Sequence, residues 1–138
     1  MGEPEKFEQN LTDYNPSIMG EGSCRRTAVL LPLIPAPGSR EGINSNWKIL
    51  FQRRAEHLDH QPGEICFPGG MLEPHDASPL EAARRETTEE LNVHPDSIQI
   101  MGELDSMVMP WNLILYPFSG ILRDPDSIRP DPSEVDSV

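Results

Sequence analysis

The sequence predicts an α/β fold in which a mixed β-sheet is sandwiched between helices. Residues 79–91 carry the signals of one well-marked helix, and four other stretches have the apolar patterns of strands, at residues 27–34, 47–52, 98–104 and 112–122. A doubly wound parallel sheet would need more crossover helices than this sequence signals. A single strongly marked helix therefore favours a mixed sheet.

The first two strands are expected at residues 27–34 and 47–52. The first is a continuous apolar run, which is typical of a strand buried on both faces. Pro32 lacks a backbone N–H, so we expect it either to end this strand or to place it at a sheet edge. In residues 47–52 the side chains alternate between two faces, which predicts the partner of the first strand. Residues 35–45, rich in Pro, Gly and Ser, are expected to form the loop between them.

The sequence carries clear signals for the N-terminus of the helix. Ser78 is a capping residue, Pro79 fits the first helical position, and Glu81 completes an S-x-x-E capping box. With about 100° per residue, one stripe of the helix should face the core. It consists of Leu80, Ala83, Thr87 and Leu91.

Three carboxylates, those of Glu86, Glu89 and Glu90, fall on another arc of the same helix. Like charges so close together are best tolerated when a cation lies between them, and an all-oxygen set suits Mg²⁺ or Mn²⁺. Arg85 precedes Glu89 by one turn and is expected to pair with it. A solvated acidic helix face is the common alternative. The flexible backbone of Gly69-Gly70 upstream favours the site, because it permits close approach of a ligand.

The remaining elements are less clearly marked. Residues 98–104 alternate like a strand, and residues 112–122 form an apolar run in which Pro117 should cause a break or a bulge. The methionines and Trp111 between them would suit a substrate pocket, although such residues pack in cores more often. Residues 53–63 are charged and should form a loop over the site. Its two histidines are more simply explained by solvation than by metal ligation.

Composition limits the classes of function. The 138 residues suffice for one domain, and the formal charge of −12 excludes charge-driven binding of nucleic acid or anionic membranes. A phosphate-bearing substrate would be repelled unless a divalent metal intervenes. There is no apolar run of 18 residues and no signal-peptide pattern, so a cytoplasmic location is expected. Cys24 and Cys66 match neither a zinc site nor a disulfide framework, and Cys66 is interpreted as a small buried hydrophobe.

The glycines and the helix together resemble the Nudix box, G-x5-E-x7-R-E-U-x-E-E-x-G-U. The matching residues are Gly70, Asp76 and the run from Arg85 to Val93. Asp76 stands for the first Glu, and the spacing from it to Arg85 is one residue longer. Thr87 in the apolar slot is a mild departure, as is Asn92 in place of Gly, because Asn also suits a left-handed cap.

A second motif narrows the resemblance. Residues 50–55, Gly63 and residues 67–70 are similar to the signature of the coenzyme A pyrophosphatase subgroup, L-L-T-x-R-[SA]-x3-R-x3-G-x3-F-P-G-G. Asp59 stands where that signature has its second Arg. The longer box with an Asp agrees with this subgroup. The resemblance covers about residues 27 to 135, and the order of the two motifs makes it specific.

This resemblance implies a Nudix fold and hydrolysis of the pyrophosphate linkage of coenzyme A or its derivatives, giving phosphopantetheine and adenosine 3′,5′-bisphosphate. It implies Mg²⁺ or Mn²⁺ as cofactor and a small nucleotide of the coenzyme A type as substrate. The implied metal ligands are Glu86, Glu89 and Glu90. The implied catalytic residues are Glu86, Glu89 and Arg85, with Glu86 as the preferred base or as a ligand shared between ions. The implied substrate-binding residues are Arg54, Gly69 and Gly70, and Glu134 is a further candidate carboxylate.

The resemblance also bears on domain organisation. Residues 1–26 are expected to be a polar segment and residues 27–138 the Nudix domain, which relatives extend with another strand and a C-terminal helix. We therefore expect a domain truncated at its C-terminus. The alternatives are hydrolysis of another nucleoside diphosphate derivative, such as ADP-ribose or NADH, and a non-catalytic binding module that keeps the fold. Whether the chain forms a homodimer is left open.

Overall fold

The computed structural model describes residues 21–38 and 46–138. Most of the predicted N-terminal polar segment and of the loop at residues 35–45 therefore lies outside the described residues. The described part contains the α-helix α2 (Pro79–Leu91) and three short 3-10 helices, η1 (Glu21–Ser23), η2 (Pro95–Ser97) and η3 (Pro125–Ser127). Its strands are β1 (Arg25–Ile34), β2 (Lys48–Ile49), β3 (Gln52–Arg54), β4 (Ile65–Cys66), β5 (Gly69–Met71), β6 (Ile98–Glu103), β7 (Met107–Met109), β8 (Leu113–Leu122) and β9 (Val135–Ser137).

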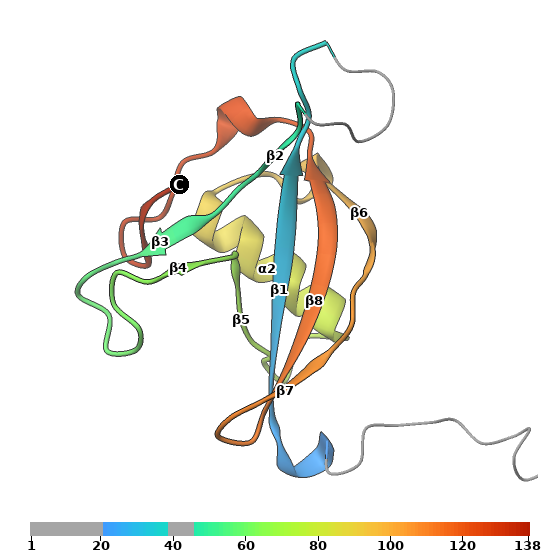
Figure 1. Cartoon of the computed structure of the whole chain (residues 1–138), viewed down its shortest axis with the longest axis vertical. Helices are drawn as coiled ribbons and strands as arrows, with labels where there is room; N and C mark the ends of the chain where they lie inside the picture. Colours follow the sequence, from blue (N-terminus) through green and yellow to red (C-terminus); the bar gives the residue numbers. More distant parts are fainter. Residues whose placement is uncertain (1–20, 39–45) are drawn as a thin grey trace, which may run out of the picture.

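The larger sheet is mixed, as predicted. Its strand order is β2-β1-β8-β6, with β5 also paired to β1 and β7 also paired to β8. Strands β1 and β8 run side by side in parallel along almost their whole length, and the other pairs are antiparallel (Figure 1). A second, smaller sheet has the order β4-β3-β9. The predicted strand at residues 47–52 is thus divided, with β2 joining the large sheet and β3 the small one.

Two prolines lie inside the long central strands, which corrects two expectations. Pro32 neither ends β1 nor lies at an edge, since it pairs with Gly120 of β8, and Pro117 does not break β8, since it pairs with Val29. On its other side β1 changes partner from β5 to β2 around Pro32, and β8 changes from β7 to β6 around Pro117. Each missing N–H therefore falls where no regular ladder bond is required.

Helix α2 begins and ends as the sequence predicts. The Ser78 hydroxyl accepts a hydrogen bond from the Glu81 backbone N–H at 3.2 Å, Pro79 is the first helical residue, and Asn92 adopts the left-handed conformation at the C-cap. The expected core stripe is confirmed, with Ala83, Thr87 and Leu91 fully buried and Leu80 partly buried.

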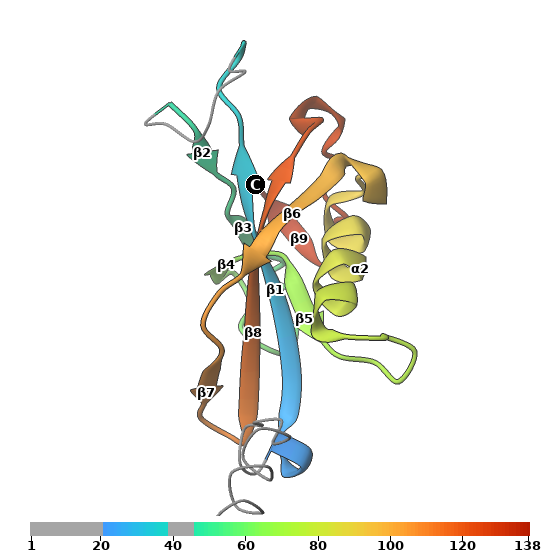
Figure 2. The same ribbon diagram turned by 90° about the vertical axis from the view of Figure 1, so that its right-hand side faces the viewer.

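The core lies between α2 and one face of the large sheet (Figure 2). Its largest fully buried apolar residues include Leu30 from β1, Leu91 from α2, and Ile114 and Leu122 from β8. The described part contains one α-helix, so the helix expected on the other face of the sandwich is not among these residues. None of the helices in residues 21–38 and 46–138 has the length and apolar composition that a bilayer crossing requires.

The segment around Trp111 is not part of the core. Trp111 is 81% exposed, and the three residues of the edge strand β7 are exposed too. Trp111 and Asn112 both have positive φ, which shapes the tight turn between β7 and β8. Core packing, the more frequent use of such residues, is therefore wrong for this segment.

Candidate active site

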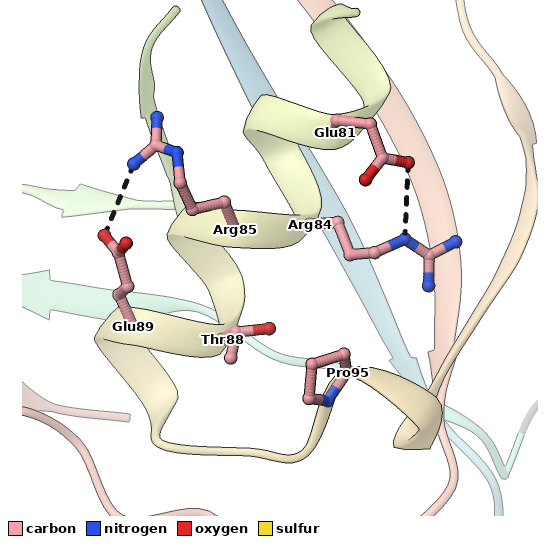
Figure 3. A pocket seen from close by; sticks show the side chains of 6 residues that line it. All are labelled: Glu81, Arg84, Arg85, Thr88, Glu89 and Pro95. Atoms are coloured by element: carbon pink, nitrogen blue, oxygen red, sulfur yellow. Dashed lines mark hydrogen bonds and ion pairs between the residues drawn. The ribbon is translucent and has the colours of Figure 1, made fainter. Parts of the chain in front are cut away.

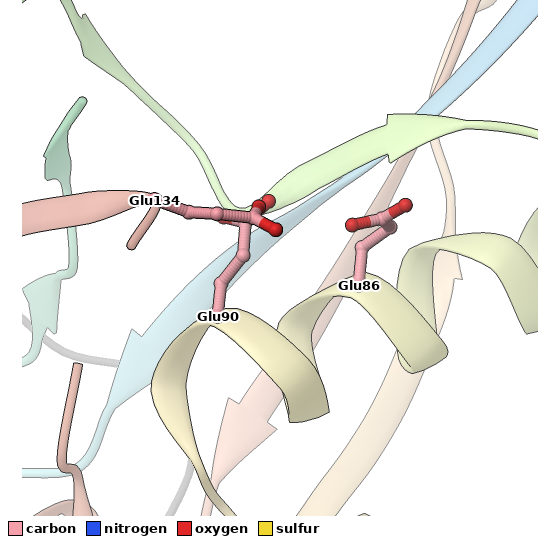
Figure 4. Close-up of side chains that lie close together, drawn as sticks. All are labelled: Glu86, Glu90 and Glu134. Carbon is pink, nitrogen blue, oxygen red and sulfur yellow. The ribbon is translucent and has the colours of Figure 1, made fainter. Parts of the chain in front are cut away.

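Three carboxylates converge beside the N-terminal end of β5, those of Glu86, Glu90 and Glu134 (Figure 4). One oxygen from each lies within 4.8 Å of the others. Glu86 and Glu90 stand one helical turn apart on α2, so their side chains share a face of the helix. Glu134 comes from the loop that immediately precedes β9. The cluster thus joins two segments that are separated by more than forty residues.

Glu134 reaches the cluster because its loop caps the C-terminal end of α2. The backbone N–H groups of Arg129 and Asp131 donate to the carbonyl oxygens of Leu91 and Glu90, at 2.9 and 2.8 Å. These are carbonyl groups that the helix cannot satisfy internally. The Glu134 carbonyl in turn accepts from the N–H of Ala55 at 2.9 Å. Backbone hydrogen bonds to α2 and to Ala55 therefore fix the position of Glu134.

Glu90 is the buried member of the cluster, with only 3% of its surface exposed. Burial raises the pKa of its carboxyl to about 7, and the charges of Glu86 and Glu134 act in the same direction. Hydrogen bonds from the Gln52 side chain and the Gly69 backbone oppose this rise in pKa. Burial also raises the pKa of Glu86, against the influence of Arg85. In the metal-free chain, holding all these carboxylates ionised is therefore costly.

The two glycines of β5 bring the backbone against the cluster and against β1. A Cβ atom at Gly70 would lie 2.6 Å from both Cδ and Oε1 of Glu86. A Cβ atom at Gly69 would lie 2.3 Å from the carbonyl oxygen of Ala28, in the neighbouring strand β1. Close packing against the backbone of β1 requires glycine at Gly69, whereas a Cβ at Gly70 would force the Glu86 side chain to move.

Arg85 ties the loop after β5 to the helix. Its guanidinium forms two bonds of 2.9 Å with the Asp76 carboxylate, and its Nη1 lies 2.9 Å from Glu86 Oε1 and 3.3 Å from Glu89 Oε2. The Arg85 hydrogen bonds lower the pKa of Asp76 to about 2. The predicted pairing of Arg85 with Glu89 is confirmed. Arg85 thus orients Glu86 and is itself held by Asp76.

The structure places two of the predicted site residues away from the cluster. Glu89 is exposed on the outer side of α2, where it bonds to Arg85 and lines a surface pocket (Figure 3). The other residues of that pocket are Glu81, Arg84, Arg85, Thr88 and Pro95. Arg54 donates through Nε and Nη2 to the carbonyl oxygen of His60, at 3.2 and 3.1 Å. The roles of Glu89 as a ligand and of Arg54 at a phosphate stay predictions.

Two residues important to the site were not singled out for it from the sequence. Gln52 contacts Glu90 from β3, and its side chain is buried at 2% exposure. A glutamine in an alternating strand carries no local signal of such a contact. In the sequence Asp76 is only a position of the box, and its role as the anchor of Arg85 follows from the fold of the loop. Cys66, interpreted as buried, is partly exposed, and partial burial raises the pKa of its thiol.

The donor set fits a hard divalent cation. All three side chains offer carboxylate oxygens, which Mg²⁺ and Mn²⁺ prefer, and no thiolate or imidazole belongs to the group. A cation between them would favour the ionised form of Glu86 and Glu90, whose pKa values are raised without it. Glu86, Glu90 and Glu134 are therefore the residues of the described part that are arranged to hold a metal ion.

Comparison with known proteins agrees with this geometry. The profile of the NUDIX domain matches residues 38–138. The chain is 28% identical over 146 residues to the mouse peroxisomal coenzyme A diphosphatase NUDT7, covering 99% of this chain and 59% of that protein. It is 33% identical over 109 residues to Nudix hydrolase 3 of Caenorhabditis elegans, covering 75% and 42%. The chain thus spans about half the length of the curated relatives that it matches.

Solved structures show the same fold. A binary complex of the C. elegans Ap4A hydrolase superposes with a TM-score of 0.62 at 18% identity, covering 80% of this chain and 75% of that one. A NUDIX hydrolase from Nitrosomonas europaea superposes with a TM-score of 0.60 at 23% identity, covering 83% and 57%. With the matching profile, the mixed sheet and the helix that carries the box residues, the chain belongs to the Nudix family.

Proposed function

We propose that this protein hydrolyses the pyrophosphate linkage of coenzyme A or its derivatives in a reaction that depends on Mg²⁺ or Mn²⁺. The observation that carries the proposal is the cluster of Glu86, Glu90 and Glu134 against the backbone of Gly70. This arrangement combines oxygen ligands for a cation with one member, Glu134, that is exposed at the surface. The products would be phosphopantetheine and adenosine 3′,5′-bisphosphate.

The charge of the chain supports a metal-dependent reaction. With a formal charge of −12, the protein repels a diphosphate unless positive charge is supplied at the site. A divalent cation bound there would neutralise the diphosphate and lower the pKa of an attacking water. Arg85, which contacts Glu86 in the cluster, is already engaged by Asp76, Glu86 and Glu89.

The residues around the cluster are proposed to have different roles in the reaction. Glu86 is the proposed base that takes the proton of the attacking water, because its carboxylate lies at the cluster beside Gly70 and 13% of its side chain is exposed. Glu90 and Glu134 would hold the cation together with Glu86. Arg85 orients the Glu86 carboxylate, and Gly69 and Gly70 let the loop pass beneath the phosphates. Glu89 would join the ligands only after leaving Arg85.

Specificity for coenzyme A is supported by the segment before the box. Arg54, Ala55 and Gly63 match the coenzyme A pyrophosphatase signature, whereas Asp59 does not. The similarity to the mouse coenzyme A diphosphatase points in the same direction at modest identity. A cytoplasmic location stays a prediction, since the name of that relative places it in the peroxisome. A homodimer likewise stays untested.

A product assay tests the proposal. The chain is incubated with coenzyme A, ADP-ribose and NADH, each with and without Mg²⁺ or Mn²⁺, and the products are identified by mass spectrometry. We expect metal-dependent cleavage of coenzyme A that exceeds cleavage of the other two. Equal rates on all three would favour a general nucleoside diphosphate hydrolase. Tight nucleotide binding without turnover would favour a non-catalytic module.

A further inference from the structure

A buried glutamine contacts the carboxylate cluster from the smaller sheet. Gln52 is the first residue of β3, and its amide nitrogen Nε2 donates a hydrogen bond to Oε2 of Glu90. Both side chains are almost completely buried, at 2% and 3% exposure. Since α2 packs on the large sheet, this bond connects the helix to the smaller sheet at the site itself.

The same amide leaves an acceptor unused. Gln52 Oε1 is buried and has no hydrogen-bond partner among the described residues. Burying a polar atom without a partner is unfavourable, and an apolar side chain of similar size would avoid that cost. Such a side chain would also remove the donor from Glu90. Stability alone therefore does not account for a glutamine here, whereas its bond to Glu90 does.

The bond from Gln52 helps to fix the orientation of the Glu90 carboxylate. The carboxylate receives hydrogen bonds from the Gln52 side chain and from the backbone N–H of Gly69, which belong to different sheets. Two donors from separate elements restrict the rotation of the carboxylate. An ionised carboxylate has about four acceptor positions, so two remain for other partners. The neighbouring carboxylates of Glu86 and Glu134 each place an oxygen within 4.8 Å of a Glu90 oxygen.

We propose that Gln52 is a positioning residue of the metal site. It holds Glu90 in the orientation in which the free oxygen positions meet those of Glu86 and Glu134, and so increases the affinity for a divalent cation. Groups that bond to metal ligands fix the orientation of those ligands in this way, and their loss weakens metal affinity about 10- to 100-fold. This inference rests on the proposed function, since it takes the metal site as given.

The test measures Mn²⁺ binding directly, through the electron paramagnetic resonance signal of the free ion. Gln52→Met keeps the volume of the side chain and removes the donor. Gln99→Met is the matched control, because Gln99 is an exposed residue of β6 whose side chain accepts from Arg123. We expect the Mn²⁺ dissociation constant to rise about 10- to 100-fold in Gln52→Met and to stay within twofold in the control.

A second measurement uses the unchanged chain, so that the test does not depend on folding of the variant. In NMR spectra, the side-chain amide signals of Gln52 should shift when Mg²⁺ is added, and those of Gln99 should not. A folded Gln52→Met variant with unaltered Mn²⁺ affinity, or unmoved Gln52 signals, would overturn the positioning role and leave the metal site standing. Absence of Mn²⁺ binding by the unchanged chain would overturn the metal site and this inference together.

Discussion

Asp76 and Arg85 form a bidentate ion pair, with Nε–Oδ1 and Nη2–Oδ2 distances of 2.9 Å each. The Asp76 side chain is 3% exposed and that of Arg85 is 17% exposed, so water competes little for either group. Paired bonds of this geometry between charged groups are among the strong hydrogen bonds of proteins. This pair secures the loop between β5 and α2 and so sets the position of Glu86.

Asp76→Asn should destabilise the fold by about 1 to 3 kcal/mol, because it removes a charge-assisted bond and leaves Arg85 partly unpaired. Urea unfolding followed by circular dichroism measures the change. Glu81→Gln serves as the control, since Glu81 meets Arg84 at 4.0 Å with 53% of its side chain exposed. Loss of this exposed ion pair should lower the free energy of unfolding by no more than about 1 kcal/mol. A smaller effect for Asp76 than for Glu81 would contradict the anchoring role.

The same pair predicts an acid dependence. The pKa of Asp76 is lowered from 3.8 to about 2 in the folded chain. Its contribution to stability is therefore present above pH 3.8 and is lost as the pH falls through 2. Between pH 4 and pH 2, the unfolding free energy of the unchanged chain should drop more than that of Asp76→Asn. Parallel curves would show that Asp76 titrates normally.

The buried carboxyl of Glu90 should give stability the opposite dependence on pH near neutrality. Its pKa is raised from 4.5 to about 7, so its favourable contribution is fully present below pH 4.5 and is lost as the pH rises through 7. The metal-free chain should be more stable at pH 5 than at pH 8, and Glu90→Gln should reduce that difference by roughly 2 to 4 kcal/mol. Chemical unfolding at a series of pH values, with chelator present, measures both. An unchanged difference in Glu90→Gln would assign the effect to other groups.

Metal binding should raise the melting temperature by mass action. Because Glu86, Glu90 and Glu134 converge, Glu90→Gln and Glu134→Gln should each remove most of the rise at millimolar Mg²⁺ or Mn²⁺. Glu89→Gln should retain more of it, since Glu89 bonds to Arg85 outside the cluster. Thermal melts of the three variants with and without metal decide the point. An equal loss in Glu89→Gln would make Glu89 a ligand in the metal-bound state.

The two neighbouring glycines should respond differently to alanine. Gly70→Ala places a methyl group 2.6 Å from the Glu86 carboxylate, a side chain that can move, so turnover should fall at least tenfold with modest loss of stability. Gly69→Ala meets the Ala28 backbone at 2.3 Å and should lower stability more. Gly22→Ala is the control, because a Cβ there has no neighbour within 4 Å. Kinetics and unfolding of all three variants separate the two effects.

Arg54 tests the substrate assignment. If its guanidinium meets a substrate phosphate, Arg54→Ala should raise KM for coenzyme A with a smaller change in kcat. In the structure Arg54 bonds to the His60 carbonyl, so its substitution should also loosen that loop. Arg54→Lys keeps the charge and loses the two-nitrogen contact, which makes it the informative companion. A fall in kcat alone would argue against a binding role.

The sequence by itself determined the features that depend on near neighbours. The ends of α2 follow from Ser78, Pro79 and Asn92, because capping and left-handed conformations depend on the residue and its adjacent backbone. The pairing of Arg85 with Glu89 follows from helical spacing. Helical spacing likewise predicts that Glu86 and Glu90 share a face of the helix, and the single strongly marked helix predicts the mixed sheet.

Only the tertiary structure decided the contacts made across the chain. Pro32 and Pro117 lie within central strands because those strands change partners there, and strand pairing is not encoded in the strand itself. Helix spacing groups Glu89 with Glu86 and Glu90, whereas Glu134, a candidate only through the family resemblance, joins the cluster because residues 129–134 cap α2. Gln52 reaches Glu90 only because the smaller sheet packs at this end of the helix. Contacts so distant in sequence depend on the whole fold, and no local pattern predicts them.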